Sequence, residues 1–273
     1  MKKIRNYILY YTRLFIYKIF SIRHWINDVE INDLFLKKNN SFFYISNKLK
    51  FIFTPQKKIG KLYIDSSLVK TDLCELGKDS KTDKSPYNTI LHRHPYTAVY
   101  SLILSSLKEK KINLAEIGIL DNASIKMWRN YFSKAKIFGF EYDEKMIKKA
   151  KEDKLVNVLY KKIDVTSNKS INESFAKCGV KFDLIIDDST HTFKDQINII
   201  KECQKFLVPG GILIIEDIPR IHSEYNEAKY YKALKSYLKF FNFVNFIDCD
   251  HINKFSKGWD NDKILILVRN EKK

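Results

Sequence analysis

Cysteine is scarce in this chain, and its cysteines are far apart in the sequence. The four thiols belong to Cys74, Cys178, Cys203 and Cys249, and no two of them form a CxxC pair. A cysteine-based zinc cluster or a disulfide framework needs paired cysteines, so we expect neither. A chain without structural disulfides fits the reducing cytoplasm, which is the location that we predict.

The chain also lacks an uninterrupted apolar run long enough to span a membrane. Its most apolar stretch, residues 4–22, is broken by Arg13 and Lys18, and no small-residue cleavage site follows it. This pattern argues against both a spanning helix and a signal peptide. As an amphipathic helix, the stretch would present a broad aromatic and aliphatic face. We expect that face to pack on the protein or on a partner subunit, in a homo-oligomer. The alternative is peripheral contact of residues 1–25 with the inner face of a membrane.

Acidic residues are too few to balance the basic ones, and the net charge is +17. Residues 1–60 hold 12 Lys and Arg against 3 Asp and Glu, which places 9 of the 17 excess charges there. Such a charge suits nucleic acid, an anionic membrane or an anionic substrate, although lysine drift on solvated faces explains it equally well. The sequence contains no recognisable RNA-binding module, so nucleic acid is not the expected partner.

What the chain does have is a regular alternation of strand and helix patterns after residue 111. The predicted strands cover residues 113–118, 136–141, 156–161, 182–187 and 211–216. The predicted helices cover residues 123–132, 143–152, 168–177, 193–206 and 226–239. This alternation predicts an α/β fold with a doubly wound, mostly parallel sheet covered by helices on both faces. Two further apolar strands, at 241–247 and 263–268, end the seven-stranded sheet in an antiparallel hairpin.

The first 110 residues differ from this core, which we place at 111–273. Residues 1–70 are predicted to form an extension, with short antiparallel strands at 41–69 after the amphipathic helix. Residues 71–110 are predicted to form a polar loop and a helix at 97–110. The loop carries Thr82, Asp83, Lys84, His92, His94 and Tyr96. A long polar loop before a core is often a lid or a binding element, and the alternative is a surface loop with solvated histidines.

Two pairs of acids follow strands rich in isoleucine and leucine. Asp187 and Asp188 come near the end of FDLIIDDSTH, and Glu216 and Asp217 end GGILIIED. Parallel strands would gather these carboxylates at one edge of the sheet, with His191 nearby. They repel one another unless a proton or a cation lies among them, so we predict a divalent metal or a positively charged ligand. Taken alone, His191 could instead cap the next helix, and Asp188 could be an acid in its first turn.

Glycine is rare where the first strand of the core ends. Only Gly118 follows Glu116 there, so the GxGxxG signature is absent and a pyrophosphate is not the expected ligand. An acid at Glu141, at the end of the next strand, could accept hydrogen bonds from two ribose hydroxyls. After the third strand, Asp164 could accept one from the amino group of an adenine.

These segments together resemble a known family. EIGILDNASIKMWRNYFSKAKIFGFE, DLIIDDSTH and GGILIIED, with the preceding TDK and HPYT elements, are similar to class I S-adenosylmethionine-dependent methyltransferases. More narrowly, they resemble the metal-dependent O-methyltransferases that act on sugars in macrolides and in bacterial surface polysaccharides. The resemblance covers about residues 71–270. It implies cofactor-binding roles for Glu116, Gly118, Ser124, Glu141, Asp164 and Asp187.

The resemblance also implies a reaction. The metal ligands would be Asp188, Glu216 and Asp217, and His191 would be the general base. Oxygen ligands suit Mg²⁺, with Ca²⁺ or Mn²⁺ as substitutes. We therefore expect methyl transfer from S-adenosylmethionine to a hydroxyl of a sugar or nucleotide sugar, for capsule or other surface polysaccharides, with Asp188 and His191 catalytic. The residues of the predicted lid that would contact the substrate are Thr82, Asp83, Lys84, His94 and Tyr96. RNA methylation and a non-catalytic, membrane-associated or partner-binding role are the alternatives.

Overall fold

The computed structural model describes residues 59–89, 92–256 and 260–271. All of them belong to the larger of two compact units, Lys58–Lys273. The predicted amphipathic helix of residues 4–22 and most of the strands predicted at 41–69 lie outside the described residues. Within the described part of the chain, no helix combines the length and apolarity needed to cross a membrane.

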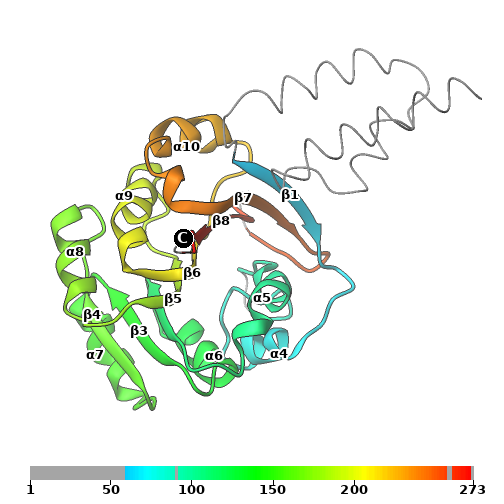
Figure 1. The fold of residues 1–273 in the computed structure, drawn as a ribbon. Helices are drawn as coiled ribbons and strands as arrows, with labels where there is room; N and C mark the ends of the chain where they lie inside the picture. The colour runs from blue at the N-terminus through cyan, green and yellow to red at the C-terminus, as the bar shows by residue number, and fades with distance from the viewer. Residues whose placement is uncertain (1–58, 90–91, 257–259, 272–273) are drawn as a thin grey trace, which may run out of the picture. The chain divides into compact units, whose positions relative to one another are not determined.

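The described residues form one sheet of eight strands, in the order β1-β7-β8-β6-β5-β2-β3-β4 (Figure 1). The strands are β1 (Gly60–Asp65), β2 (Asn113–Ile117), β3 (Lys136–Glu141), β4 (Val158–Lys162), β5 (Phe182–Asp187), β6 (Leu207–Ile215), β7 (Phe241–Asp250) and β8 (Lys263–Arg269). Of these eight strands, β8 alone is antiparallel to its neighbours, β6 and β7. The predicted doubly wound sheet with an antiparallel end is therefore confirmed, with one strand more than the seven expected.

The additional strand, β1, corrects the predicted boundary of the N-terminal extension. It pairs in parallel with β7, with Gly60 opposite Asn245 and Asp65 opposite Asp250. Residues 60–65 are thus neither antiparallel nor outside the main sheet. Their alternating pattern indicates a half-exposed strand, but it carries no information on the partner or the direction. The partner and the direction of β1 depend on the unpaired edge of β7.

Seven α-helices and four short 3₁₀ helices accompany the sheet in the described residues. The α-helices are α4 (Asp72–Asp79), α5 (Tyr96–Leu104), α6 (Ala123–Tyr131), α7 (Glu144–Glu152), α8 (Asn168–Ala176), α9 (Phe193–Cys203) and α10 (Glu227–Leu234). The 3₁₀ helices are η1 (Ser105–Leu107), η2 (Gln204–Phe206), η3 (Ser223–Tyr225) and η4 (Leu238–Phe240). Helix α4 lies where a loop was predicted. Thr71 caps it by accepting from the Cys74 N–H, and Asp72 and Glu75 favour its first turn.

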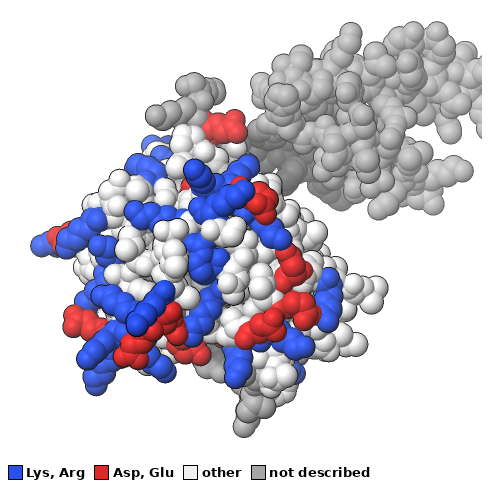
Figure 2. Space-filling model, turned by 90° about the horizontal axis from the view of Figure 1, so that it is seen from below, with Lys and Arg blue, Asp and Glu red and all other residues white. Residues whose placement is uncertain are grey.

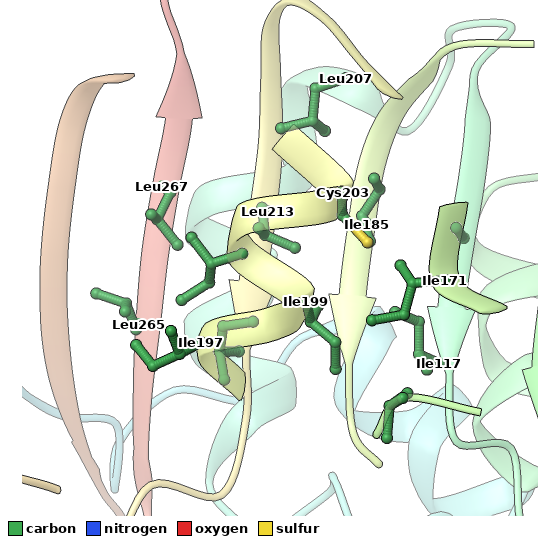
Figure 3. Packing of buried hydrophobic residues seen from close by; sticks show 14 of the residues in the cluster. Ile117, Ile171, Ile185, Ile197, Ile199, Cys203, Leu207, Leu213, Leu265 and Leu267 are labelled. Atoms are coloured by element: carbon green, nitrogen blue, oxygen red, sulfur yellow. The ribbon is translucent and has the colours of Figure 1, made fainter. Parts of the chain in front are cut away.

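The core lies on both faces of the sheet because successive strand residues point to opposite sides. On one face, Ile117, Ile185 and Leu213 pack with residues of α8, α9 and α10 (Figure 3). The other face carries Ile186 and Ile214, which pack with residues of α5 and α6. Helices on both faces hold the strands in register: Ile117 lies opposite Asp187, and Asp187 lies opposite Ile215. The residues that follow these three therefore leave the sheet at the same level.

Charge on the described surface is mixed. On the face drawn in Figure 2, Lys and Arg side chains are interspersed with Asp and Glu, and they do not form a separate stripe. Elsewhere the described surface carries exposed ion pairs such as Lys126–Asp153 at 2.8 Å and Lys162–Glu144 at 2.7 Å. The face drawn in Figure 2 offers no uniformly basic track for a phosphate backbone.

Candidate active site

A cavity of about 910 Å³ opens at the carboxyl ends of the central strands. Strands β2 to β6, of which β4 is the edge strand, each contribute one residue to its wall: Gly118 after β2, Glu141 on β3, Asp164 after β4, Asp188 after β5 and Asp217 after β6. The predicted site residues that line the cavity are Thr82, Asp83, Gly118, Ser124, Glu141, Asp164, Asp188, His191 and Asp217. This is the position at which doubly wound sheets bind ligands.

One end of the cavity depends on a glycine. Gly118 has a φ of +86°, and a Cβ at this position would lie 2.1 Å from the carbonyl oxygen of Asp188. Any side chain here would force the turn after β2 away from the turn after β5. The close approach of the two backbones therefore explains why the one glycine of the first loop occupies this position.

Two acids at the same end are fixed by backbone groups. The carboxylate of Glu141 accepts from the N–H groups of Ile119 at 3.1 Å, Leu120 at 3.3 Å, Tyr142 at 2.7 Å and Asp143 at 3.1 Å. It therefore joins the turn after β2 to the turn after β3. Asp164 accepts through Oδ1 from the backbone and the hydroxyl of Thr166. Both acids are oriented in advance of any ligand.

At the other end of the cavity, three side chains converge. The Nε2 atom of His191 lies 3.9 Å from Asp188 Oδ1 and 3.9 Å from Asp217 Oδ2. One ligand atom from each of the three residues lies within 4.8 Å of the others. Two acidic oxygens and one imidazole nitrogen facing a cavity can hold a cation, or can accept and stabilise a proton.

Neither capping interpretation of these residues holds. Helix α9 is capped by Thr192, whose hydroxyl accepts from the Asp195 N–H, so His191 lies outside the helix. Asp188 lies four residues before the cap, where its N–H bonds to the Ile117 carbonyl oxygen at 2.8 Å. His191 and Asp217 both have a φ of +56°, a backbone strain that is concentrated at functional sites.

Asp217 is held in place by the predicted loop and by the loop between β7 and β8. Its Oδ1 accepts from the Tyr96 hydroxyl at 2.8 Å, and its Oδ2 accepts from the Asn261 amide at 2.9 Å. Tyr96, predicted to contact the substrate, is fully buried and does not line the cavity. It positions an acid of the site from behind.

Glu216 is not brought to this group, although it was predicted to bind metal with Asp188 and Asp217. Lys84 lies between them: its Nζ donates to Asp188 Oδ2 and to Glu216 Oε2, and the Tyr100 hydroxyl donates to Glu216 Oε1. Burial alone would lower the pKa of the Lys84 ammonium, but Asp188, Glu216 and Glu116 raise it well above its usual value. Lys84 therefore acts as an internal counter-ion, and it is too deeply buried to contact a ligand as predicted.

Two predicted cofactor residues, Glu116 and Asp187, lie beneath the cavity wall. Glu116 accepts from the Ser124 hydroxyl at 2.9 Å and lies 3.5 Å from the Lys84 ammonium. Asp187 is covered by Ser189, whose hydroxyl donates to it at 2.6 Å. Burial raises the pKa of each carboxyl to about 7. Neither acid lines the cavity, because Glu116 points toward Lys84 and Ser124, and Ser189 covers Asp187.

The predicted loop brings His94 to the same region. His94 is buried, its Nδ1 atom lies 2.8 Å from Asp262 Oδ1, and its Nε2 atom lies 3.5 Å from Asp217 Oδ2. Burial would lower the pKa of this imidazole, but Asp217 and Asp262 raise it to about 9. His94 is therefore not the solvated loop histidine of the alternative interpretation.

Sequence reasoning missed Tyr100, Asn261 and Asp262. Tyr100 lies in a helix whose apolar pattern predicts only core packing. The other two are in a polar loop between the last strands, and nothing in that loop marks it as part of a site. They reach the acids because β8 is antiparallel to β6 and therefore begins beside the carboxyl end of that strand.

The chain is similar to proteins of a known family. A family model described as a methyltransferase domain matches residues 122–264, just over half of the chain. Among curated proteins, 8-demethyl-8-alpha-L-rhamnosyl tetracenomycin-C 2'-O-methyltransferase of Streptomyces olivaceus is 23% identical over 132 residues, which cover 46% of this chain and 33% of that protein. Demethylmacrocin O-methyltransferase of Streptomyces fradiae is 25% identical over 132 residues, with 46% and 32% covered. The matched region thus spans about a third of these relatives.

A solved structure shows the same fold. The MycE methyltransferase from the mycinamycin biosynthetic pathway, in complex with Mg, SAH and mycinamycin VI, aligns with a TM-score of 0.55 and 17% identity. The alignment covers 74% of this chain and 55% of that chain. The sheet order, the antiparallel β8 and the cavity at the strand ends agree with the match over residues 122–264, and the chain belongs to the methyltransferase domain family.

Proposed function

We propose that this protein transfers a methyl group from S-adenosylmethionine to a hydroxyl of a sugar. The observation that carries the proposal is that one cavity is lined both by the Gly118 turn with Glu141 and Asp164 and by the Asp188, His191 and Asp217 group. The first end suits an adenosine-containing donor, and the second suits an acceptor that must lose a proton. Proximity in a single cavity is what a two-substrate displacement requires.

The donor end fits its ligand. The Gly118 turn packs directly against the turn after β5 and forms part of the cavity wall, and Ser124 also lines the cavity. We assign Glu141 to the ribose hydroxyls and Asp164 to the adenine amino group, because both acids line this end of the cavity. Ser189 lies between Asp187 and the cavity, so we assign Asp187 to the support of this wall and not to direct contact with the donor.

A divalent metal also fits the acceptor end. Asp188 Oδ1 and Asp217 Oδ2 face His191 across the same space, and two carboxylate oxygens beside open solvent suit Mg²⁺, which retains several water ligands. Glu216 would join them only by giving up Lys84. When bound, the ion would lower the pKa of the acceptor hydroxyl and orient it.

The residues of the chain then divide the work. His191, with 40% of its side chain exposed, removes the hydroxyl proton through Nε2, which lies 3.9 Å from an oxygen of each acid. As the hydroxyl oxygen bonds to the methyl carbon, the carbon–sulfur bond breaks and its electron pair remains on sulfur. Tyr96 and Asn261 keep Asp217 in place throughout.

The acceptor class rests on the relatives. Two of them are named for methylation of a rhamnosyl group or of demethylmacrocin, and a sugar hydroxyl suits the base and metal arrangement here. Lys81 lies at the cavity wall. An acceptor with a phosphate or nucleotide would meet its charge there, which agrees with a role in surface polysaccharide synthesis.

Calorimetry and turnover test the proposal. We expect the full chain to bind S-adenosylhomocysteine, and Gly118→Ala to abolish that binding. Gly179→Ala is a matched control, because Gly179 also has a positive φ (+67°) but its Cβ would meet nothing within 4 Å. Methyl transfer to a panel of phosphorylated and nucleotide-linked sugars should depend on Mg²⁺ and on Asp188. Absence of cofactor binding by the wild type would refute the proposal, and turnover that survives chelation would refute its metal.

A further inference from the structure

Two imidazoles of the predicted loop face each other beside the cavity. The Nε2 atoms of His92 and His94 are 2.7 Å apart, and the rings are nearly perpendicular, with centroids 4.4 Å apart. Histidines rarely present the same ring nitrogen to each other at this distance without a proton or a cation between them, because two nitrogen lone pairs repel.

The group at the far side of each ring can accept a hydrogen bond from Nδ1. His94 Nδ1 lies 2.8 Å from an oxygen of Asp262, and an ionised carboxylate only accepts, so Nδ1 carries the proton. His92 Nδ1 lies 3.3 Å from the Ser256 hydroxyl oxygen, which can accept in the same way. With a proton on each Nδ1, a cation that replaces the proton between the two Nε2 atoms would meet an electron pair on both. A carboxylate behind the imidazole, as Asp262 lies behind His94, is the arrangement that orients histidines bound to metals.

A third ligand atom completes the group. One carboxylate oxygen of Asp83 and one nitrogen of each imidazole all lie within 4.8 Å of one another. Backbone bonds fix their relative positions. The His94 N–H donates to the Asp83 carbonyl oxygen at 2.6 Å, and Arg93 and Phe255 exchange N–H···O bonds at 2.8 and 3.0 Å. The three side chains come from two points of the loop that are held together independently of any ion.

We propose that Asp83, His92 and His94 form a second cation site, which binds a divalent transition metal ion and prefers Zn²⁺. Two imidazole nitrogens and one carboxylate oxygen are a three-residue set that zinc sites use, with the remaining position open. Nitrogen ligands favour Zn²⁺ over Mg²⁺, so this set differs in kind from the oxygen-rich pair of Asp188 and Asp217. For Zn–N bonds near 2.05 Å in a tetrahedral site, the two nitrogens would be roughly 3.3 Å apart, so the rings must separate by only about half an ångström.

The surroundings favour a positive charge at this point. His94 is buried, and Asp217 Oδ2 lies 3.5 Å from its Nε2. The carboxylates of Asp217 and Asp262, which lie at 3.5 and 2.8 Å from the two nitrogens of His94, would stabilise a metal ion bound to this imidazole. Asp83 and His92 line the cavity, so the open position of the ion would be accessible to a ligand there. Metal binding at this site does not depend on methyl transfer, so it can be measured without an activity assay.

Metal content is the first test. After loading with Zn²⁺ and dialysis, the wild-type chain should retain one ion, measured by elemental analysis. His92→Ala should weaken binding by at least about 100-fold, because it removes a ligand and not merely an outer partner, whose loss costs about 10–100-fold. His222→Ala, a change at an exposed histidine, and Asp188→Asn should retain the ion. Retention by His92→Ala, loss in Asp188→Asn, or no ion in the wild type would overturn the proposal.

Spectroscopy on the wild-type chain provides a second test, which does not depend on whether His92→Ala folds. In the Co²⁺-substituted protein, the Nδ1 protons of two metal-bound imidazoles should give two strongly shifted, exchangeable proton resonances. The Asp188, His191 and Asp217 group can supply one at most. Two resonances support the proposed site, and one or none refutes it. His92→Gln, which keeps the side-chain volume more closely, should lose one of the two.

Discussion

Two lysines of the described chain have equally buried side chains, but the same substitution should destabilise the fold strongly at one and little at the other. Lys84 and Lys263 are each 1% exposed. The ammonium of Lys84 bonds to Asp188 and Glu216 and lies 3.5 Å from Glu116. Lys263 has Glu227 at 3.8 Å, and that acid is one-third exposed. We predict that Lys84→Met strongly destabilises the fold and that Lys263→Met does not.

The magnitude follows from what each substitution leaves behind. Lys84→Met leaves buried carboxylates without a counter-ion, and breaking a buried ion pair on one side costs about 3–5 kcal/mol. For a folded unit of this size, that loss corresponds to a fall in Tm of roughly 6–20 °C. Lys263→Met leaves the same Glu227 oxygen with the Lys61 ammonium at 3.5 Å, so we expect a change within about 1 kcal/mol, of either sign.

Urea unfolding followed by circular dichroism measures both free energies of unfolding, and the slope with urea shows whether the unfolded states are comparable. Equal losses for the two variants would refute the counter-ion role of Lys84, because burial alone would then explain both. A loss below about 1 kcal/mol for Lys84→Met, within the range of ordinary surface changes and small repacking, would refute it as well.

Three further predictions concern the base, the glycine turn and pH. His191→Ala should lower turnover by about 10²–10⁴-fold, the usual contribution of a general base, and should change the melting temperature little because the side chain is 40% exposed. The control, His222→Ala, should change neither turnover nor melting temperature. Equal turnover rates for the two variants would exclude His191 as the base. Gly179→Ala should cost about 1 kcal/mol of stability through its positive φ, whereas Gly118→Ala should cost more, because its Cβ would also displace the Asp188 carbonyl. Urea unfolding measures the free energy of unfolding of both variants. An equal loss in the two would contradict the close approach of the Gly118 and Asp188 backbones. Burial lowers the pKa of Lys263 in the folded state, so its charge destabilises the fold fully at neutral pH and the penalty disappears as the pH rises through the folded pKa towards the unfolded value. Any advantage of Lys263→Met over the wild type should therefore shrink between neutral pH and about pH 10, and an advantage that grew with pH would contradict burial as the cause.

The sheet and the position of the site could be predicted because both depend on local patterns. Apolar runs such as FDLIID fix buried strands, and in a doubly wound sheet their carboxyl ends meet by necessity. The acids and the histidine that follow two such runs, Asp188, His191 and Asp217, are therefore predicted to lie together. The antiparallel end of the sheet follows in the same way from two strands joined by a loop without a helical pattern.

The direction of individual side chains could not be predicted. Glu216 and Asp217 are adjacent, yet one contacts Lys84 in the interior and the other faces the cavity. Asp217 adopts a left-handed backbone, which breaks the strand alternation at that residue. The polar loop around Lys84 predicts a place in the lid, but the loop folds inward and buries this side chain. The direction of each side chain depends on contacts between segments about 100 residues apart, which the local sequence pattern does not indicate.

The alignment of three strand ends also has a kinetic consequence. Ile117, Asp187 and Ile215 lie side by side in the sheet, yet they come from distant parts of the chain, and the residues that follow them build the cavity. Each pairing requires closure of a long loop, which is entropically unfavourable and slow compared with helix formation. During refolding, ligand binding therefore cannot return before β2, β5 and β6 have all paired. Its recovery reports completion of the central sheet, which helical circular dichroism alone does not.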